Sequence, residues 1–169
     1  HILDQIPDKM KPESFFWKFP TEEEIGKKKL YTTTWSYFEN WDPYRNYLVA
    51  KEFCGLQENE SVNSGTFTNF AQNDQALYSL HTYLMFLKYG FGRANQDASI
   101  EIRRGALSRD QAINLVKLYD GLFPEQYLEL YLDYYQMKKE DFLKVIDSWA
   151  NKDILEKIDN KWHLRMEII

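Results

Sequence analysis

The chain has 169 residues, 44% of them hydrophobic and 28% charged, which is enough apolar sequence to bury the core of one domain. Its formal net charge of −5 argues against general nucleic-acid binding, which depends on many lysine and arginine contacts to phosphates. The single cysteine, Cys54, excludes an internal disulfide and a thiolate zinc cluster, and we expect it to be a small core residue. No apolar run approaches the ~20 residues of a membrane span. We therefore expect a soluble, cytoplasmic protein that binds neither nucleic acid nor membrane.

The first 20 residues combine three prolines with aromatic side chains, which predicts an extended aromatic arm rather than a regular element. A single helical domain is expected over residues 21–169. Thr21 followed by Glu24 is a capping-box pattern and predicts a short charged helix through Lys29.

The next segment, residues 31–38, is β-branched and aromatic and fits either a strand or a loop. We expect Trp35, Tyr37 and Trp41 to pack in the core or at an interface, with stacking on a sugar or base as the alternative. A cap at the following aspartate and a proline after it predict a helix over residues 43–54.

Polar residues 57–69 predict a loop, and the apolar run that follows predicts a central helix from about residue 73 to Tyr89, buried on most faces. On this helix, His81 is expected to be a hydrogen-bonded core residue rather than a catalytic one. Further helices are expected over about residues 95–104, 108–120, 124–135 and 138–150, followed by a small hairpin that turns at Asp159 and Asn160. The predicted fold class is mainly α, a single domain of about six helices with a small C-terminal hairpin.

The segment from Lys88 to Arg109 holds four of the six arginines. Its five basic and two acidic residues give a net charge of +3, against −5 for the whole chain. Arginine offers a rigid fork of donors that matches phosphate or carboxylate, so this segment is the candidate ligand site. The candidate substrate- or phosphate-binding residues are Lys88, Arg93, Arg103, Arg104 and Arg109, supported by Gly90, Gly92, Asp97, Ser99 and Glu101. No metal motif, nucleophile elbow or phosphate-binding loop is recognisable.

The two acids of this segment leave a second interpretation open. Asp97 and Glu101 are four residues apart, and like charges at that spacing repel on a helix unless a cation lies between them. An ion-pair network of Arg93, Asp97, Glu101, Arg103 and Arg104 that locks the helix is therefore as well supported as ligand binding.

Taken in order, the stretches KYGFGR, EIRRG, SR and LVKLYDG resemble the C-terminal region of the N-acetyl sugar amidotransferases of surface-polysaccharide biosynthesis, the WbpG-type proteins. The resemblance is close over about residues 69–121 and looser over 35–56 and 140–162. It implies the C-terminal part of a PP-loop enzyme in which ATP activates an acetamido carbonyl and ammonia replaces its oxygen. The residues that match this block, without assigned catalytic roles, are Lys88, Gly90, Gly92, Arg93, Ser99, Glu101, Arg103, Gly105, Arg109, Asp120 and Gly121.

The Ser-Gly-Gly-x-Asp-Ser loop that binds ATP in such enzymes does not occur in this sequence. The resemblance therefore implies that ATP and Mg²⁺ bind mainly on an N-terminal PP-loop domain, and that this chain alone carries no cofactor and is inactive. Its implied partners are that domain, a nucleotide-sugar substrate and a glutaminase subunit that supplies ammonia. The alternative function is a non-catalytic helical module that docks on a protein partner.

Overall fold

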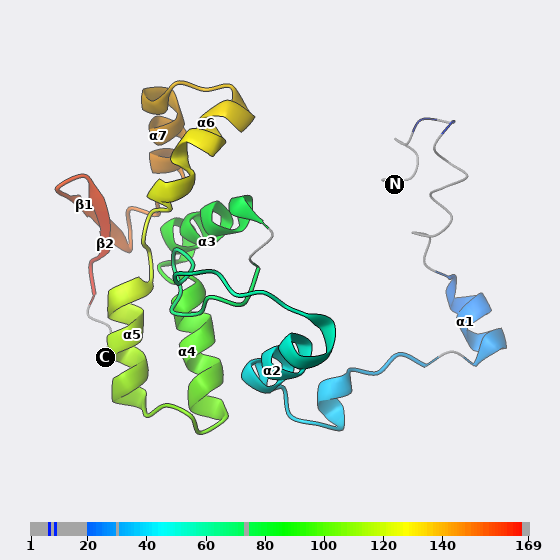
Figure 1. The fold of residues 1–169 in the computed structure, drawn as a ribbon. Helices are drawn as coiled ribbons and strands as arrows, with labels where there is room; N and C mark the ends of the chain where they lie inside the picture. The colour runs from blue at the N-terminus through cyan, green and yellow to red at the C-terminus, as the bar shows by residue number, and fades with distance from the viewer. Residues whose placement is uncertain (1–6, 8, 10–19, 30, 73–74, 167–169) are drawn as a thin grey trace. The chain divides into compact units, whose positions relative to one another are not determined.

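The computed structural model describes residues 7, 9, 20–29, 31–72 and 75–166, and divides the chain into two compact units, residues 1–41 and 42–169. The expected arm over residues 1–20 falls almost entirely outside the described residues. The described part holds seven α-helices, two 3-10 helices and one two-stranded sheet (Figure 1). The mainly α class and the small C-terminal hairpin are therefore confirmed.

In the first unit, α1 (Glu22–Lys28) starts at the predicted capping box. The Glu24 amide donates to the Thr21 hydroxyl at 3.3 Å, and the Thr21 amide donates to the Glu24 carboxylate at 2.9 Å. The aromatic segment that follows forms a single 3-10 turn, η4 (Trp35–Tyr37), so the strand alternative is wrong.

The second unit begins with α2 (Pro43–Cys54), which Asp42 caps as predicted. No residue of α2 is buried, and Cys54 is exposed, so its expected place in the core is wrong. The physical reason is that the packing contacts of α2 lie in its first half. The ring of Tyr47 stacks on Phe70 with centroids 4.3 Å apart, and Tyr44 lies near Phe70 and Arg104. Cys54, the last residue of the helix, lies beyond these contacts.

The polar segment between α2 and α3 is a loop, as predicted, and backbone bonds connect its two arms. The Asn59 amide donates to the Asn69 carbonyl at 2.9 Å, and the Asn63 amide donates to Thr68 at 3.0 Å. These bonds place Thr66, at the turn, against the start of α4, where it is buried.

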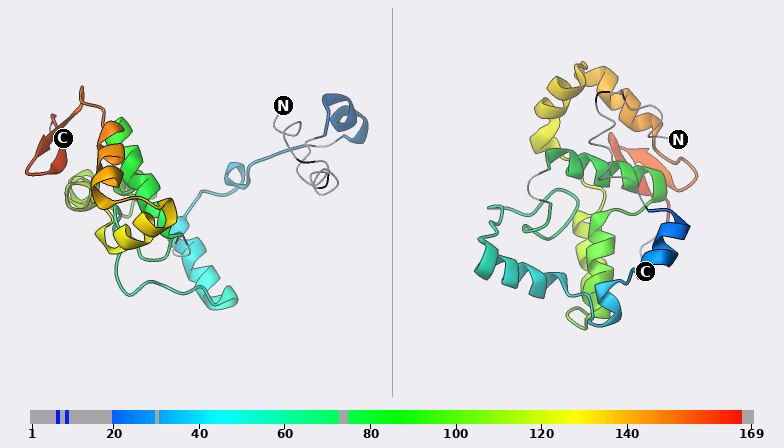
Figure 2. Two further views of the ribbon diagram at one scale, coloured as in Figure 1. Left: turned by 90° about the horizontal axis from the view of Figure 1, so that it is seen from above. Right: turned by 90° about the vertical axis from the view of Figure 1, so that its right-hand side faces the viewer.

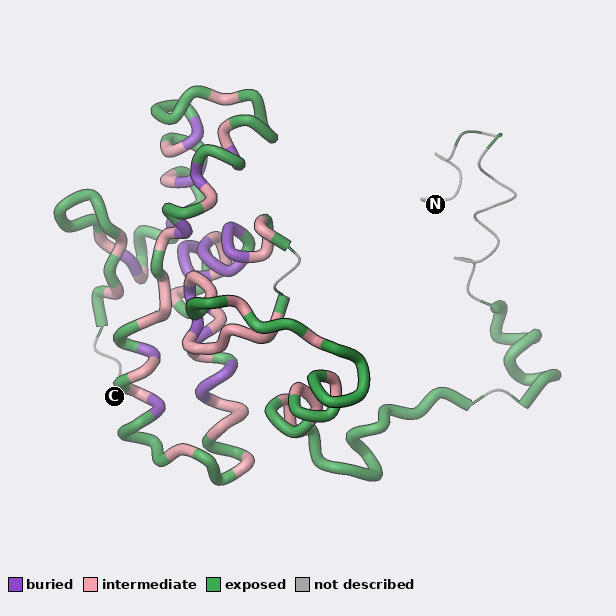
Figure 3. Tube along the Cα trace, viewed as in Figure 1, coloured by how far each residue is buried: buried purple, intermediate pink, exposed green. Residues whose placement is uncertain are grey.

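Helix α3 (Ala76–Tyr89) supplies the centre of the hydrophobic core through Leu80, Tyr83, Phe86 and Leu87 (Figure 3). These side chains pack against buried residues of α6, α7 and β1: Leu128, Tyr131, Phe142, Ile146 and Leu155.

His81 is exposed, so its expected place in the core is wrong. It lies on the same helical stripe as Leu77 and Lys88, and all three face away from the core. The lysine on this stripe was the signal that it faces solvent.

Helices α4 (Arg93–Arg103) and α5 (Arg109–Tyr119) form an antiparallel pair that lies side by side (Figure 1). Small residues at the contact, Ala98 and Ala112, let the two backbones approach, and Val116 completes this second apolar cluster.

After the turn η5 (Glu125–Tyr127) come α6 (Leu128–Tyr135), α7 (Lys139–Ser148) and the strands β1 (Leu155–Ile158) and β2 (Lys161–Leu164). The hairpin pairs Leu155 with Leu164, and its two turn residues, Asp159 and Asn160, both have positive φ, at 48° and 63°. Such a turn matches the twist of a two-residue hairpin. The hairpin lies beside the end of α3 (Figure 2), where the Asn151 amide donates to the Leu87 carbonyl at 2.8 Å.

Candidate functional site

The basic segment is continuous in sequence but divided in space. Arg93 is the first residue of α4 and Arg103 the last, and a helix of 11 residues is roughly 16 Å long. Lys88 lies near the end of α3 and Arg109 begins α5. The predicted cations therefore lie at the two ends of α4 and do not form one cluster.

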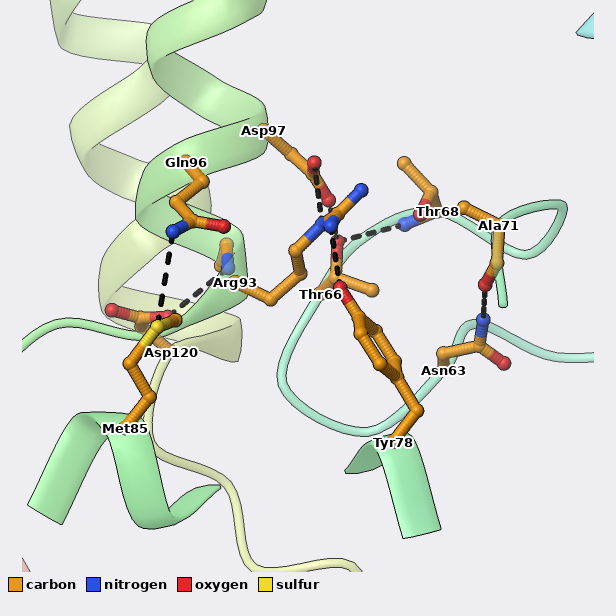
Figure 4. A network of polar contacts seen from close by, with 11 residues as sticks. Asn63, Thr66, Thr68, Ala71, Tyr78, Met85, Arg93, Gln96, Asp97 and Asp120 are labelled. Carbon is orange, nitrogen blue, oxygen red and sulfur yellow. Dashed lines mark hydrogen bonds and ion pairs between the residues drawn. The ribbon is translucent and has the colours of Figure 1, made fainter. Parts of the chain in front are cut away.

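At the N-terminal end of α4, the half-buried Arg93 is held by polar contacts (Figure 4). Its Nε donates to Asp97 Oδ1 at 2.8 Å, and its Nη1 donates to the Tyr78 hydroxyl. The second oxygen of Asp97, a residue only 7% exposed, accepts from the Thr66 hydroxyl at 2.6 Å. Burial opposes the charge on Arg93, but Asp97 and Tyr78 outweigh this effect and raise its pKa. The cluster joins α3, α4 and the preceding loop.

Beside this cluster, Asp120 caps α4 from the far end of α5. Its carboxylate accepts from the Gly92 amide at 2.7 Å and from the Ala94 amide at 3.1 Å. A Cβ at position 92 would lie 2.7 Å from Asp120 Oδ1, so a larger residue there would push the capping carboxylate aside. Burial raises the pKa of Asp120, although the amide hydrogen bonds partly offset that effect.

This cap was not predicted from the sequence, and the helix expected from about residue 95 begins two residues earlier, at Arg93. The one available signal was the lack of a serine, threonine or acidic cap before α4, where Gly92 stands instead.

At the C-terminal end of α4, Arg104 makes the second ion pair. Its Nη1 donates to Glu101 Oε2 at 2.9 Å, and its Nε lies 3.2 Å from Asp42 Oδ1. The Arg45 amide, followed by Arg104, lowers the pKa of Asp42. The guanidinium of Arg104 also lies 5.8 Å from the ring centre of Tyr44. Arg104 thereby fastens α2 to α4.

The predicted ion-pair network thus exists as two separate pairs rather than one chain. Asp97 is paired with Arg93 and Glu101 with Arg104, which explains how two acids four residues apart are tolerated. Arg103 takes no part: it is exposed and has no ion pair within the described residues. Its guanidinium is therefore available to a ligand.

The remaining predicted residues have local roles. Gly90 ends α3 in the left-handed conformation, with φ 78°, and packs closely on side chains of the hairpin region. Lys88 is exposed, with its Nζ 5.2 Å from the ring centre of Tyr89, whereas Ser99 is half-buried on α4. Arg109 is exposed at the start of α5. Ligand binding by any of these residues stays a prediction.

Two hollows border these elements. One, of about 40 Å³, lies beside Arg93, Asp97 and Glu101 and has room for little more than a water molecule. The other is a cleft of about 1150 Å³ between the C-terminal end of α5, α7 and the hairpin, and it lies away from the predicted arginines.

Comparison with known families gives one match. The family described as "LPS biosynthesis protein WbpG-like, C-terminal domain" matches residues 64–168, well over half of the chain. The chain belongs to this family. The WbpG-like C-terminal domain extends from the loop before α3 through the hairpin, so it contains both ends of α4 and the cleft. The chain is thus a lipopolysaccharide biosynthesis protein, and the resemblance in its sequence is confirmed.

No curated protein matches the chain. In the described part of this WbpG-like protein, no helix is long and apolar enough to cross a membrane. The same residues contain no group of three or more histidine, cysteine or acidic side chains arranged to hold a metal ion.

Proposed function

We propose that this chain is the C-terminal domain of an ATP- and ammonia-dependent amidotransferase that converts the N-acetyl group of a nucleotide sugar to an acetamidino group. The observation that carries the proposal is the WbpG-like match over residues 64–168, which includes the whole basic segment. In the proposed reaction the acetamido oxygen attacks the α-phosphorus of ATP and pyrophosphate leaves. Ammonia then adds to the carbon, and AMP leaves with the oxygen. The developing negative charge calls for cationic contacts.

In this proposal the parts of the reaction are divided among domains. An N-terminal PP-loop domain would hold ATP and Mg²⁺, and a glutaminase partner would supply ammonia. From this chain we assign the anion contact to Arg103, whose exposed guanidinium has no ion pair within the described residues. The neighbouring Arg104 is bound to Glu101, so we assign it to holding α4 in place.

The test compares two adjacent arginines in the full-length enzyme. Arg103→Gln should raise the KM for ATP and leave the melting temperature unchanged. Arg104→Gln should lower stability by about 2 kcal/mol, because it breaks a half-buried pair and leaves Glu101 without its partner.

Mass spectrometry follows the reaction through the exchange of one oxygen atom for an NH group. An unchanged kcat/KM in Arg103→Gln would contradict the assigned role. The proposed reaction itself would be refuted if the full-length enzyme, given ATP, an ammonium salt and N-acetylated nucleotide sugars, formed no acetamidino product.

One observation favours the alternative of a docking module. The side chains of Tyr31, Trp35, Tyr37 and Phe38 are 68–90% exposed, which leaves a large aromatic area open to a partner. In the full-length protein, Trp35→Ser with Tyr37→Ser should then abolish co-purification of the glutaminase while turnover on added ammonia persists. Loss of turnover on ammonia with the complex intact would reject this alternative.

A further inference from the structure

We infer that the cleft between α5, α7 and the hairpin binds a phosphorylated sugar, which in the proposed reaction is the nucleotide-sugar substrate. This inference rests on the proposed function for the identity of the substrate. The cleft has a volume of about 1150 Å³, slightly larger than most small-molecule sites, and its walls come from four helices and the hairpin.

The floor of the cleft is rigid and apolar. Tyr83 and Phe86 from α3, Leu128 from α6 and Ile146 from α7 line it, and each is less than a tenth exposed. These side chains belong to the main hydrophobic core. The cleft is therefore a preformed hollow in the packed part of the domain, and its shape is fixed by the core.

Four lysines border this floor, and one of them, Lys157, is paired with Asp147. The other three come from three different elements. Lys117 lies on α5, Lys139 on α7 and Lys161 on β2, and each is exposed. Within the described residues none of the three has an ion pair. An ammonium group is a compact point charge and a common contact of phosphate oxygens, and no arginine lines the cleft. These three ammonium groups suit an anionic ligand such as a phosphate.

The acids of the cleft fall into two groups. Asp120 is bound to amides at the start of α4, and Asp147 is bound to Lys157 at 2.5 Å and to the Trp162 indole at 2.8 Å. Both carboxylates are occupied within the protein, and Asp147 holds the ring of Trp162 at the wall.

Glu125 and Asp159 also line the cleft and are exposed, without an ion pair in the part of the chain that the structure describes. Ionised carboxylates only accept hydrogen bonds, so they suit the hydroxyl groups of a ligand and repel its phosphates. A ligand that satisfies both kinds of side chain carries phosphate at one part and hydroxyls at another. This combination favours a sugar phosphate over inorganic phosphate or an acidic peptide.

The experiment is a calorimetric titration of the 169-residue chain at low ionic strength with three probes: UDP-N-acetylglucosamine, N-acetylglucosamine and inorganic pyrophosphate. We expect the sugar nucleotide to bind most tightly, pyrophosphate more weakly and the free sugar not measurably. Lys117→Gln and Lys161→Gln should each weaken binding of the sugar nucleotide about five- to tenfold. Lys152→Gln is the matched control, because Lys152 is exposed and does not line the cleft.

Three results would overturn the inference: no binding of any probe, equal affinity for pyrophosphate and the sugar nucleotide, or wild-type affinity in both lysine variants. The full-length enzyme separates this inference from the proposed function. Acetamidino product formed with an unchanged KM in Lys117→Gln and Lys161→Gln would refute the cleft alone. A sugar nucleotide that binds in the cleft but yields no product would refute the amidotransferase reaction alone.

Discussion

Removing the carboxylate of Asp120 should lower the stability of this domain more than removing any exposed acid. In Asp120→Ala the amides of the buried residues Gly92 and Ala94 lose their acceptor. A buried donor left without a partner costs about 1–3 kcal/mol, and a lost helix cap costs about 1 kcal/mol, so we expect a loss of about 3 kcal/mol. That is a large share of the roughly 5–15 kcal/mol that stabilises an ordinary domain.

Asp120→Asn separates the hydrogen bonds from the charge. Its amide oxygen still accepts from one backbone amide, but its NH₂ group faces the other, so a loss of about 1–2 kcal/mol is expected. Urea unfolding of the 169-residue chain, followed by circular dichroism, measures both variants. Asp153→Ala, which removes an exposed acid, is the control and should change stability by less than about 0.5 kcal/mol. A value for Asp120→Ala as small as that of the control would refute the capping role.

The Asp120→Asn variant also tests the raised pKa of Asp120. Burial raises the pKa of Asp120 above the ordinary value of 3.8, so the folded chain binds the proton more tightly than the unfolded chain. The contribution of this carboxyl to stability is therefore fully present below pH 3.8 and is lost as the pH rises through the raised pKa. The stability difference between wild type and Asp120→Asn should narrow from pH 4 to pH 7. A difference that widens over that range would show that the pKa is lowered instead.

Two further predictions concern packing. Gly121→Ala should destabilise the domain by more than about 3 kcal/mol, because Gly121 has a φ of +72° and a Cβ there would lie 2.6 Å from the buried ring of Phe86. The control is Gly105→Ala, at a similar φ of +76° but with open space around it, which should cost only about 1 kcal/mol. Equal losses in the two glycine variants would contradict the close packing. Tyr131→Phe removes a 2.6 Å hydrogen bond to a backbone carbonyl of α3 and should lower the free energy of unfolding by about 1 kcal/mol. Tyr134→Phe, at an exposed ring, should leave that free energy unchanged. Chemical denaturation compares the two variants.

Elements with local signals were predicted well from the sequence. The capping box at Thr21 and Glu24 involves residues three apart, and the hairpin turn depends on Asp159 and Asn160 alone, which tolerate positive φ. The start of α4 was misplaced because its cap, Asp120, is 28 residues away from Gly92. A pattern of neighbouring residues cannot predict a capping residue that far along the chain.

The grouping of the candidate site residues was also mispredicted, because residues close in sequence need not be close in space. Four arginines close together in the sequence suggested one anion site, but α4 separates Arg93 from Arg103 by its whole length. By contrast, the three unpaired lysines of the cleft, Lys117, Lys139 and Lys161, are each about 22 residues from the next along the chain and belong to no motif. Only the packing of α5, α7 and β2 reveals that they lie around one cleft. Sequence clustering and spatial clustering are separate properties, and here they select different residues.

The ion pair between Asp42 and Arg104 bears on where this domain begins. The family match starts at residue 64, yet Arg104 within it contacts Asp42 and Tyr44, which lie upstream of that boundary. The aromatic stack of Tyr47 on Phe70 crosses the same boundary. A shortened chain that begins at residue 64 would leave a guanidinium and an aromatic ring uncovered, and would invite self-association. For expression and crystallisation, a shortened chain should therefore start at Asp42, where the second compact unit begins, about twenty residues ahead of the family match.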